Sequence, residues 1–212
     1  MTKQSSPNAL PNWGDRRAVR VGLLGGSFNP GHAGHLHIAR LALRRLRLDQ
    51  VWLLVSPGNP LKAPVGMAPL ADRLRSAQAI ADGRRIVATD IEQALGTRFT
   101  LDTLRMLRRR FPRVRFVWLM GADNLAQLPR WRRFRAMVGE TQIAVLPRPT
   151  YTLPALSGRA ARLMRRARVP DARAPALALL PVPHWVVLHG RENALSATLL
   201  RHAEILPPGE LP

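Results

Sequence analysis

Short runs of apolar residues recur along the chain, and between them apolar positions follow helical spacing. Each run has four to six residues, which is the length of a buried strand and too short for a helix. Turn-forming residues such as Pro57, Gly58 and Pro147 end several of the runs. The predicted strands are residues 19–24, 51–55, 85–88, 116–120, 142–146 and 185–188.

Helical periodicity fills the stretches between these strands. One helix begins near His32 and ends around residues 47–49, and a second runs from near Ala68 to residue 81. Residues 90–96 form a predicted loop, after which Thr100 is the expected N-cap of a helix over 100–110. One helix or a pair of short helices is predicted between residues 121 and 138. Strands that alternate with helices predict an α/β fold with a doubly wound, mostly parallel sheet of about five or six strands.

The pattern is weaker at the ends of the chain and between residues 151 and 183. We expect a flexible basic tail over residues 1–18, a single domain over 19–206 and a Pro-rich tail over 207–212. Residues 159–168 predict a basic helix, followed by a poorly ordered connection rich in Ala and Pro. A last short helix is predicted over 196–204. A chain of 212 residues is long enough for one sizeable core.

The composition shows a strong excess of positive charge and excludes the kinds of site that need cysteine. The 33 Lys and Arg residues outnumber the 13 Asp and Glu residues, and the resulting formal charge of +20 favours anionic partners. Only two of the basic residues are lysines, Lys3 and Lys62, so a GC-rich coding bias accounts for the excess as well as nucleic-acid binding does. No cysteine is present, which excludes disulfides and thiolate metal sites. No apolar run approaches the ~20 residues that span a bilayer, so a cytoplasmic protein is expected.

The most informative stretch is the Gly-rich turn between the first strand and the first helix. It reads Gly-Gly-Ser-Phe-Asn-Pro-Gly-His-Ala-Gly-His over residues 25–35, and it matches neither the Walker phosphate loop nor the Gly-x-Gly-x-x-Gly fingerprint. Glycine allows a sharp turn and close approach to a ligand. His32 and His35 lie three residues apart at a helix N-terminus, so both can face one anion. The alternative is a helix cap together with a zinc-like pair, but no cysteine or nearby carboxylate completes a metal set.

This turn resembles the signature of the nucleotidylyltransferase superfamily, with its (Thr/His)-x-Gly-His. Together with the motifs below, which cover most of the chain, it resembles more narrowly the bacterial nicotinate-nucleotide adenylyltransferases. The resemblance implies a Rossmann-like nucleotidylyltransferase fold. It also implies an ATP-binding loop formed by Gly25, Gly26, Ser27, Phe28, His32 and His35.

Two further segments resemble the family's nucleotide-binding motifs. Gly121-x-Asp123 matches a Gly-x-Asp motif in which the aspartate holds a polar group of the nucleotide, although Asp123 could equally be a helix N-cap. The closing motif Ile-Ser-(Ser/Thr)-Thr-x-Ile-Arg appears here over residues 195–201, with an alanine at position 197 in place of one hydroxyl. The resemblance assigns its contacts with the β- and γ-phosphates to Ser196, Thr198 and Arg201.

The remaining motifs imply a pocket for a pyridine mononucleotide. Residues 128–131 resemble Leu-x-x-Trp, whose tryptophan stacks on the nicotinate ring, although a core tryptophan would give the same pattern. Residues 97–104 resemble Ser-Tyr-Thr-x-Asp-Thr-Leu, with phenylalanine replacing tyrosine at position 99. Residues 59–62 resemble Asn-Pro-x-Lys, and Arg98, Arg132 or Arg148 would favour a carboxylate by charge. The expected contacts with nicotinate mononucleotide are Asn59, Lys62, Thr97, Phe99, Thr100, Trp131, Arg132 and Arg148.

The resemblance implies attack of the 5′-phosphate of nicotinate mononucleotide on the α-phosphorus of ATP, a step of NAD biosynthesis that releases pyrophosphate. Charge at the transferring group would come from the catalytic residues His35, His32, Lys62 and Arg201, and Mg²⁺ would be carried mainly by the ATP phosphates. The alternatives are adenylyl transfer to nicotinamide mononucleotide or another phosphorylated acceptor and, from another class, a basic nucleic-acid-binding protein. The sequence also leaves open a homo-oligomer.

Overall fold

The computed structural model describes residues 18–58, 66–148 and 150–190. The predicted tails, apart from Ala18, and the predicted helix over 196–204 therefore lie outside the described residues. So do five of the expected site residues: Asn59, Lys62, Ser196, Thr198 and Arg201.

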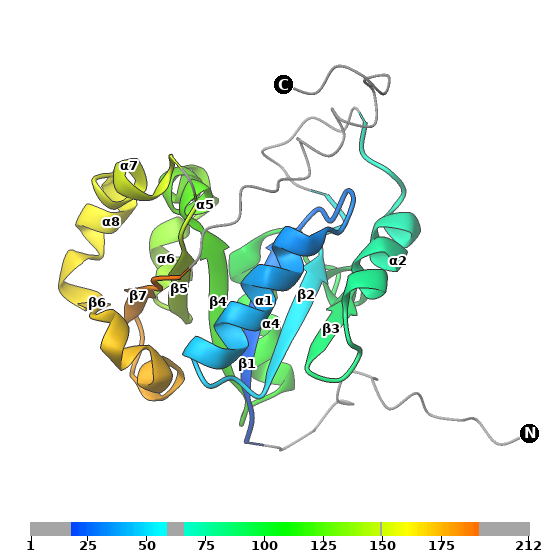
Figure 1. The fold of residues 1–212 in the computed structure, drawn as a ribbon. Coiled ribbons are helices and arrows are strands. Elements are labelled where there is room, and N and C mark those ends of the chain that lie inside the picture. Colours follow the sequence, from blue (N-terminus) through cyan, green and yellow to red (C-terminus); the bar gives the residue numbers. More distant parts are fainter. Residues whose placement is uncertain (1–17, 59–65, 149, 191–212) are drawn as a thin grey trace, which may run out of the picture.

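Seven parallel strands form one sheet in the order β3-β2-β1-β4-β5-β7-β6 (Figure 1). The six predicted strands are present within one or two residues of their expected ends, and β6 is an additional strand of two residues. The strands are β1 Arg20–Gly26, β2 Gln50–Val55, β3 Ile86–Thr89, β4 Arg115–Gly121, β5 Gln142–Leu146, β6 Arg168–Val169 and β7 Trp185–Val187.

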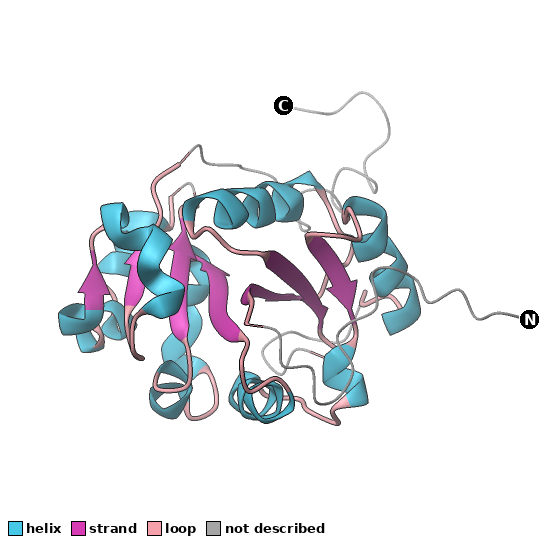
Figure 2. Cartoon of the chain, turned by 90° about the horizontal axis from the view of Figure 1, so that it is seen from below, coloured by secondary structure: helices cyan, strands magenta, loops and turns pink. Residues whose placement is uncertain are grey.

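Helices cover both faces of the sheet, as expected for a doubly wound fold (Figure 2). One face packs against α1 Ala33–Arg45, α2 Leu70–Ile80 and the 3₁₀ helix η3 Asp171–Leu179. The opposite face packs against α3 Ile91–Ala94, α4 Thr100–Arg110, α5 Ala122–Gln127, α6 Phe134–Val138, α7 Thr152–Leu156 and α8 Arg159–Leu163. The buried strands are apolar on both faces because helices cover both.

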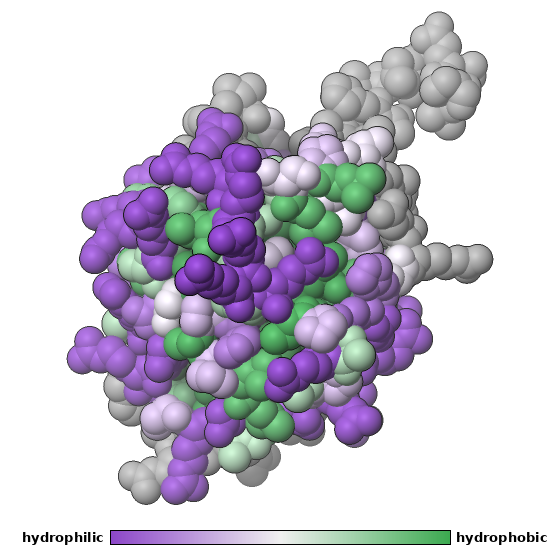
Figure 3. Space-filling view, turned by 90° about the vertical axis from the view of Figure 1, so that its left-hand side faces the viewer, coloured by the Kyte–Doolittle hydropathy of each residue, from purple (hydrophilic) through white to green (hydrophobic). Residues whose placement is uncertain are grey.

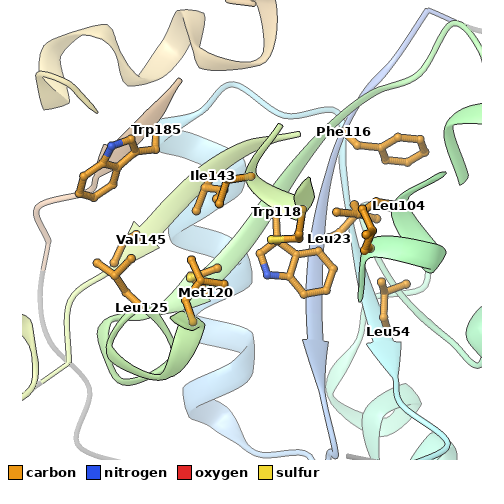
Figure 4. Close-up of a cluster of buried hydrophobic side chains, with 14 of the residues drawn as sticks. Leu23, Leu54, Leu104, Phe116, Trp118, Met120, Leu125, Ile143, Val145 and Trp185 are labelled. Carbon is orange, nitrogen blue, oxygen red and sulfur yellow. The ribbon is translucent and has the colours of Figure 1, made fainter. Parts of the chain in front are cut away.

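The larger part of the core lies on the α4–α8 face. Phe116, Trp118 and Met120 alternate along β4 and share this face with side chains from the neighbouring strands (Figure 4). Trp52 contacts two phenylalanine rings edge-on there, with ring centroids 5.6 Å from Phe111 and 5.8 Å from Phe116. These aromatic contacts fix the central strands that carry the loops described below.

The structure corrects the prediction for residues 151–183. This stretch contains α7, α8, β6 and η3, and the connection expected to be poorly ordered forms the nine-residue η3. Ala174, Leu177 and Ala178 of η3 are buried against the sheet, and Arg45 on α1 forms an ion pair with Asp171 at its start. The small apolar residues of η3 thus pack against the sheet, although the Pro-rich composition of this segment indicated a loop.

Three smaller differences concern helix ends and short helices. Residues 90–96, expected as a loop, contain α3, and the N-cap of α4 is Phe99 in place of the predicted Thr100. The expected basic helix over 159–168 is helical as α8 up to Leu163 and continues as the 3₁₀ helix η2 Arg165–Ala167. On the side of the molecule where α7 and α8 lie, hydrophilic side chains are interspersed with hydrophobic ones (Figure 3). No helix within the described residues is long and apolar enough to span a membrane.

Candidate active site

The described parts of the predicted site lie beyond the carboxyl ends of the central strands. The Gly-rich turn follows β1, residues 97–100 follow β3 and α3, residues 121–124 follow β4, and Arg148 follows β5. The sheet order reverses at β1 and β4, and a doubly wound sheet binds its ligands outside the strand ends at such a point. The fold therefore brings these segments to one edge, as the sequence predicted.

The two glycines at the end of β1 make room for neighbouring aromatic rings. A Cβ atom on Gly25 would lie 2.8 Å from the Trp118 ring, and one on Gly26 would lie 3.2 Å from the Phe28 ring. Both glycines belong to the strand, so the sharp turn expected from them comes later. Phe28, with φ of 49°, is the residue that adopts the left-handed conformation.

Phe28 is part of the core. Its side chain is fully buried among the α1 and α2 contacts, with its ring centroid 4.6 Å from that of His35. Phe28, which was expected to bind ATP, is therefore not exposed to a ligand in this structure. The buried ring packs against the His35 ring.

His32 and His35 cap α1 reciprocally. The Nδ1 atom of His32 accepts a hydrogen bond from the backbone N–H of Gly34 at 3.1 Å, and the backbone N–H of His32 donates to Nδ1 of His35 at 3.3 Å. The two ring centroids are 3.9 Å apart. Because each Nδ1 accepts, the hydrogen-bond pattern assigns the proton of a neutral ring to Nε2. The predicted histidine pair therefore forms at the N-terminus of a helix, where the helix dipole favours an anion.

Of the two histidines, His32 is uncharged at neutral pH. Burial, followed by the positive charge of Arg148, lowers the pKa of His32 to about 4 from an ordinary value of 6.5. The whole residue is only 6% exposed. His32 is thus a neutral hydrogen-bond donor, and this changes the expectation that it supplies positive charge to a phosphate.

A second cluster lies at the start of α5. The Oδ1 atom of Asp123 is buried and accepts no hydrogen bond from the described residues, and Nε of Arg148 lies 3.8 Å from it. A Cβ atom on Gly121 would lie 2.3 Å from Asp123 Oδ1 and 3.2 Å from Arg148 Nε. A side chain at 121 would displace this carboxylate, and glycine leaves the space to it. An unsatisfied buried acceptor is costly, so this atom is suited to a donor that arrives with a ligand.

Arg148 belongs to this cluster with Asp123 and His32, the residues expected to bind ATP. The sequence had assigned Arg148 to nicotinate mononucleotide together with Arg132. Arg132 has different surroundings: its guanidinium lies 4.4 Å from the centroid of the Phe99 ring. Of the two arginines, the structure thus associates only Arg132 with the 97–104 motif.

Phe99 and Arg132 line a small surface pocket at the N-terminus of α4, together with Leu101, Asp102 and Arg133. No carboxylate of the described residues lies within ion-pair distance of Arg132. The neighbouring Trp131 is half-buried and packs edge-on against Trp118, with ring centroids 6.2 Å apart. A cation, a helix N-terminus and an aromatic ring therefore lie close together on this side of the site.

A buried hydrogen-bond network supports the 97–104 motif from below. Thr103 Oγ1 lies 2.9 Å from both Glu92 Oε1 and Thr97 Oγ1, and Thr97 itself is buried. Burial raises the pKa of Glu92, while hydrogen bonds from Thr103 and Ser56 oppose this shift. Thr97, expected as a substrate contact, holds the loop in place through its hydroxyl, whereas Thr100 is half-exposed in the first turn of α4.

No sequence motif identifies Glu92 or the buried Arg73. Glu92 stands in a polar stretch with nothing to separate it from a solvated glutamate, and Arg73 is one arginine among many. The signal that the sequence offered for Arg73 was its position on the inner face of the helix α2, where the structure has it buried. Within the described residues, no group of three or more His, Asp or Glu side chains could hold a metal ion.

Comparisons with known proteins agree with this architecture. The cytidylyltransferase-like family matches residues 23–203. A protein of Gluconobacter oxydans named "probable nicotinate-nucleotide adenylyltransferase" is 60% identical over 185 residues, which cover 87% of this chain and 95% of that protein. A protein of the same name from Gluconacetobacter diazotrophicus is 57% identical over 194 residues, which cover 92% and 90% of the two chains.

A solved structure is similar in fold. The nicotinic acid mononucleotide adenylyltransferase of Plasmodium falciparum complexed with NaAD has a TM-score of 0.66 and is 14% identical, with 87% of this chain and 83% of that chain covered. At that identity the likeness concerns the fold.

Proposed function

Because the chain belongs to the nicotinate-nucleotide adenylyltransferases, within the cytidylyltransferase-like family, we propose that it transfers the adenylyl group of ATP to nicotinate mononucleotide. The 5′-phosphate of the mononucleotide attacks the α-phosphorus of ATP in line. The bond from that phosphorus to the β-phosphate oxygen breaks, which gives nicotinate adenine dinucleotide and pyrophosphate. This reaction is a step of NAD biosynthesis.

The histidine pair at the N-terminus of α1 is the observation that carries the proposal. The attacking phosphate is already a nucleophile, so the protein needs to position two anions and to stabilise the charge on the transferring group. His32 and His35, next to the positive end of a 13-residue helix, are suited to donate from Nε2 to phosphate oxygens. Lys62 and Arg201 remain proposed partners for the phosphates.

The cluster at the start of α5 supports the binding of the nucleotide part of ATP. The buried, unsatisfied Oδ1 of Asp123 would accept a hydrogen bond from a hydroxyl or amino group, and Arg148 beside it would face a phosphate. Mg²⁺, when bound, would neutralise part of the charge on the ATP phosphates. We expect phosphate oxygens and water to hold it mainly, with Asp123 as the nearby carboxylate.

Recognition of the pyridine acid is assigned to the pocket at the N-terminus of α4. The nicotinate ring would stack on Trp131, and its carboxylate would face the guanidinium of Arg132 and the first N–H groups of α4. Phe99 has no hydroxyl with which to contact the substrate, but its ring holds the arginine by a cation–π contact. Arg132 therefore favours nicotinate over nicotinamide by charge.

The test compares pyrophosphate release from Mg·ATP with nicotinate mononucleotide and with nicotinamide mononucleotide at equal concentrations. For the wild type we expect a strong preference for the acid. Arg132→Met should lower kcat/KM for the acid by about tenfold, the effect of one partly exposed charged hydrogen bond, and leave the amide reaction unchanged. Arg130→Met is the matched control because Arg130 is exposed on the same segment and is not among the residues that line the pocket of Phe99 and Arg132.

The other outcomes separate the alternatives. Equal losses for both substrates in Arg132→Met would refute the role of this arginine in selecting the acid. Preference of the wild type for the amide would keep the reaction and overturn the acceptor. Turnover with neither, combined with salt-sensitive binding to random oligonucleotides, would favour a nucleic-acid-binding protein.

A further inference from the structure

Arg73 on α2 is a charged side chain enclosed inside the protein. It is 3% exposed, and no carboxylate of the described residues forms an ion pair with it. Burial lowers its pKa, although an arginine keeps its charge in proteins. A buried cation without an anionic partner is costly unless every donor is used, so its position requires an explanation.

Among the described residues, the guanidinium donates only to backbone carbonyls. Nη1 donates to Ser27 O at 2.8 Å and to Ser56 O at 2.7 Å, Nη2 to Pro57 O at 3.5 Å, and Nε to Ala68 O at 2.9 Å. Ser27 lies in the Gly-rich turn after β1, and Ser56 and Pro57 follow β2. One side chain therefore joins three segments that are far apart in the sequence.

These segments leave the sheet side by side. Gly26 of β1 is in register with Val55 of β2, and the backbone N–H of Ser56 donates to Gly26 O at 3.0 Å. Beyond that bond the two strands end, and no further backbone–backbone hydrogen bond joins the described parts of the two loops. The side chain of Asn29 in the turn bonds the backbone of Gly66 and Ala68 further along. Arg73 continues the connection, because its planar fork reaches the carbonyls of Ser27 and Ser56 from one nitrogen.

The helix α2 also contacts the Gly-rich turn at the end of the turn that is farther from Ser27. Ser76 Oγ, one turn further along α2, accepts the backbone N–H of Gly31 at 2.8 Å. A Cβ atom on Gly31 would lie 2.8 Å from the Ser76 carbonyl oxygen, so glycine is needed for this close approach. Arg73 and Ser76 thus hold both ends of the stretch that leads directly into the His32 cap.

We infer that Arg73 is a positioning residue for ATP binding, which fixes the backbone of the Gly-rich turn through Ser27 and holds it against the loop after β2. Its enclosed charge also adds positive potential behind the turn, where an anion binds. The inference rests on the proposed function, because it assumes that this turn holds the ATP phosphates. Arg73 itself does not touch the substrate.

The experiment measures the Kd of Mg·ATP by calorimetry, without the second substrate, for the wild type, Arg73→Lys and Arg73→Met. Arg75→Lys is the matched control, since Arg75 lies on the same helix with a side chain 76% exposed and paired with Asp72. A lysine ammonium is a single point and cannot bridge carbonyls as the guanidinium fork does. We expect Arg73→Lys to raise the Kd about tenfold, as for a loop displaced from its bound geometry, and Arg75→Lys to leave it unchanged.

The thermal midpoint of each variant is measured in parallel, and binding is measured well below it. A merely structural role would lower the Tm of Arg73→Lys and leave the Kd of the folded protein at the wild-type value, which would overturn the inference. Arg73→Met, which leaves the carbonyls without a donor, is expected to lower the Tm further. Failure of the wild type itself to bind ATP or to turn over would instead refute the proposed function.

Discussion

The neutral state of His32 makes the stability of this protein depend on pH in a defined direction. In the unfolded chain His32 has its ordinary pKa of 6.5, whereas in the folded protein burial and Arg148 lower the pKa to about 4. Between these values the unfolded chain binds more protons than the folded protein, so the free energy of unfolding rises with pH. The contribution is complete above pH 6.5 and is lost below pH 4.

The size of the effect follows from the two pKa values. The difference between 6.5 and about 4 corresponds to about 3 kcal/mol. The structural cause is specific: Nδ1 accepts the N–H of Gly34 as the N-cap of α1, and a second proton on the ring would abolish that bond. Protonation therefore removes the cap and places an unpaired charge beside Arg148.

The perturbation is His32→Asn. Asparagine is among the best N-cap residues and retains an oxygen acceptor for the Gly34 N–H, but it does not titrate. Urea unfolding followed by tryptophan fluorescence at a series of pH values from 4 to 7.5 gives the free energy of unfolding of both proteins. The free energy of unfolding of the wild type minus that of the variant should rise by about 3 kcal/mol from pH 4 to pH 7.5.

His37→Asn, on the same helix, is the control, because it keeps the His32 cap and should keep the pH-dependent loss of stability. A difference between wild type and His32→Asn that stays constant from pH 4 to 7.5 would refute the reasoning. His32 would then be able to accept a proton in the folded protein, and it could supply charge to the phosphates after all.

Two further predictions concern residues near the site. Burial raises the pKa of Glu92, so the folded protein binds more protons than the unfolded chain above pH 4.5 and its stability falls as pH rises. Glu92→Gln should flatten this fall in the same urea series. An unchanged dependence of the free energy of unfolding on pH would contradict this prediction. Gly121→Ala should raise the KM for ATP about tenfold or more by displacing Asp123, with little change in Tm, because the added Cβ would lie 2.3 Å from Oδ1. Gly139→Ala, whose Cβ would lie 3.4 Å from the nearest atom, is the control, and equal KM values in both variants would contradict the argument.

The sheet could be predicted from the sequence because each central strand is a short apolar run between turn residues. The three longest helices, α1, α2 and α4, extend over at least eleven residues, so that apolar periodicity identifies them. The helices α3 and α7 have four and five residues, which is too short for a periodic pattern. In η3, the Pro and Ala content indicated a loop, and only packing against β7 and the sheet shows why these small residues form a helix.

The site was predictable to the extent that its residues lie in local motifs. The motifs predicted that His32 and His35 follow the first strand and that Asp123 follows the fourth, and the structure has them after β1 and β4. What the sequence could not give is how burial changes each residue: His32 is neutral, Phe28 is in the core, and Arg148 lies beside Asp123. These properties arise from contacts between segments distant in the chain.

The excess of arginine illustrates the same point, because part of it serves the interior and the loops. Arg73 donates to four carbonyls, Arg85 donates to Leu48 O at 2.8 Å, and Arg108 donates to both the carbonyl and the carboxylate of Glu140. A guanidinium that binds carbonyls joins loops without needing an acidic partner. A chain with few carboxylates can therefore use many arginines in this way, and its net charge of +20 is by itself a weak indication of a polyanionic ligand. The substrate phosphates are small anions, and the cations that would meet them are selected by position at the strand ends.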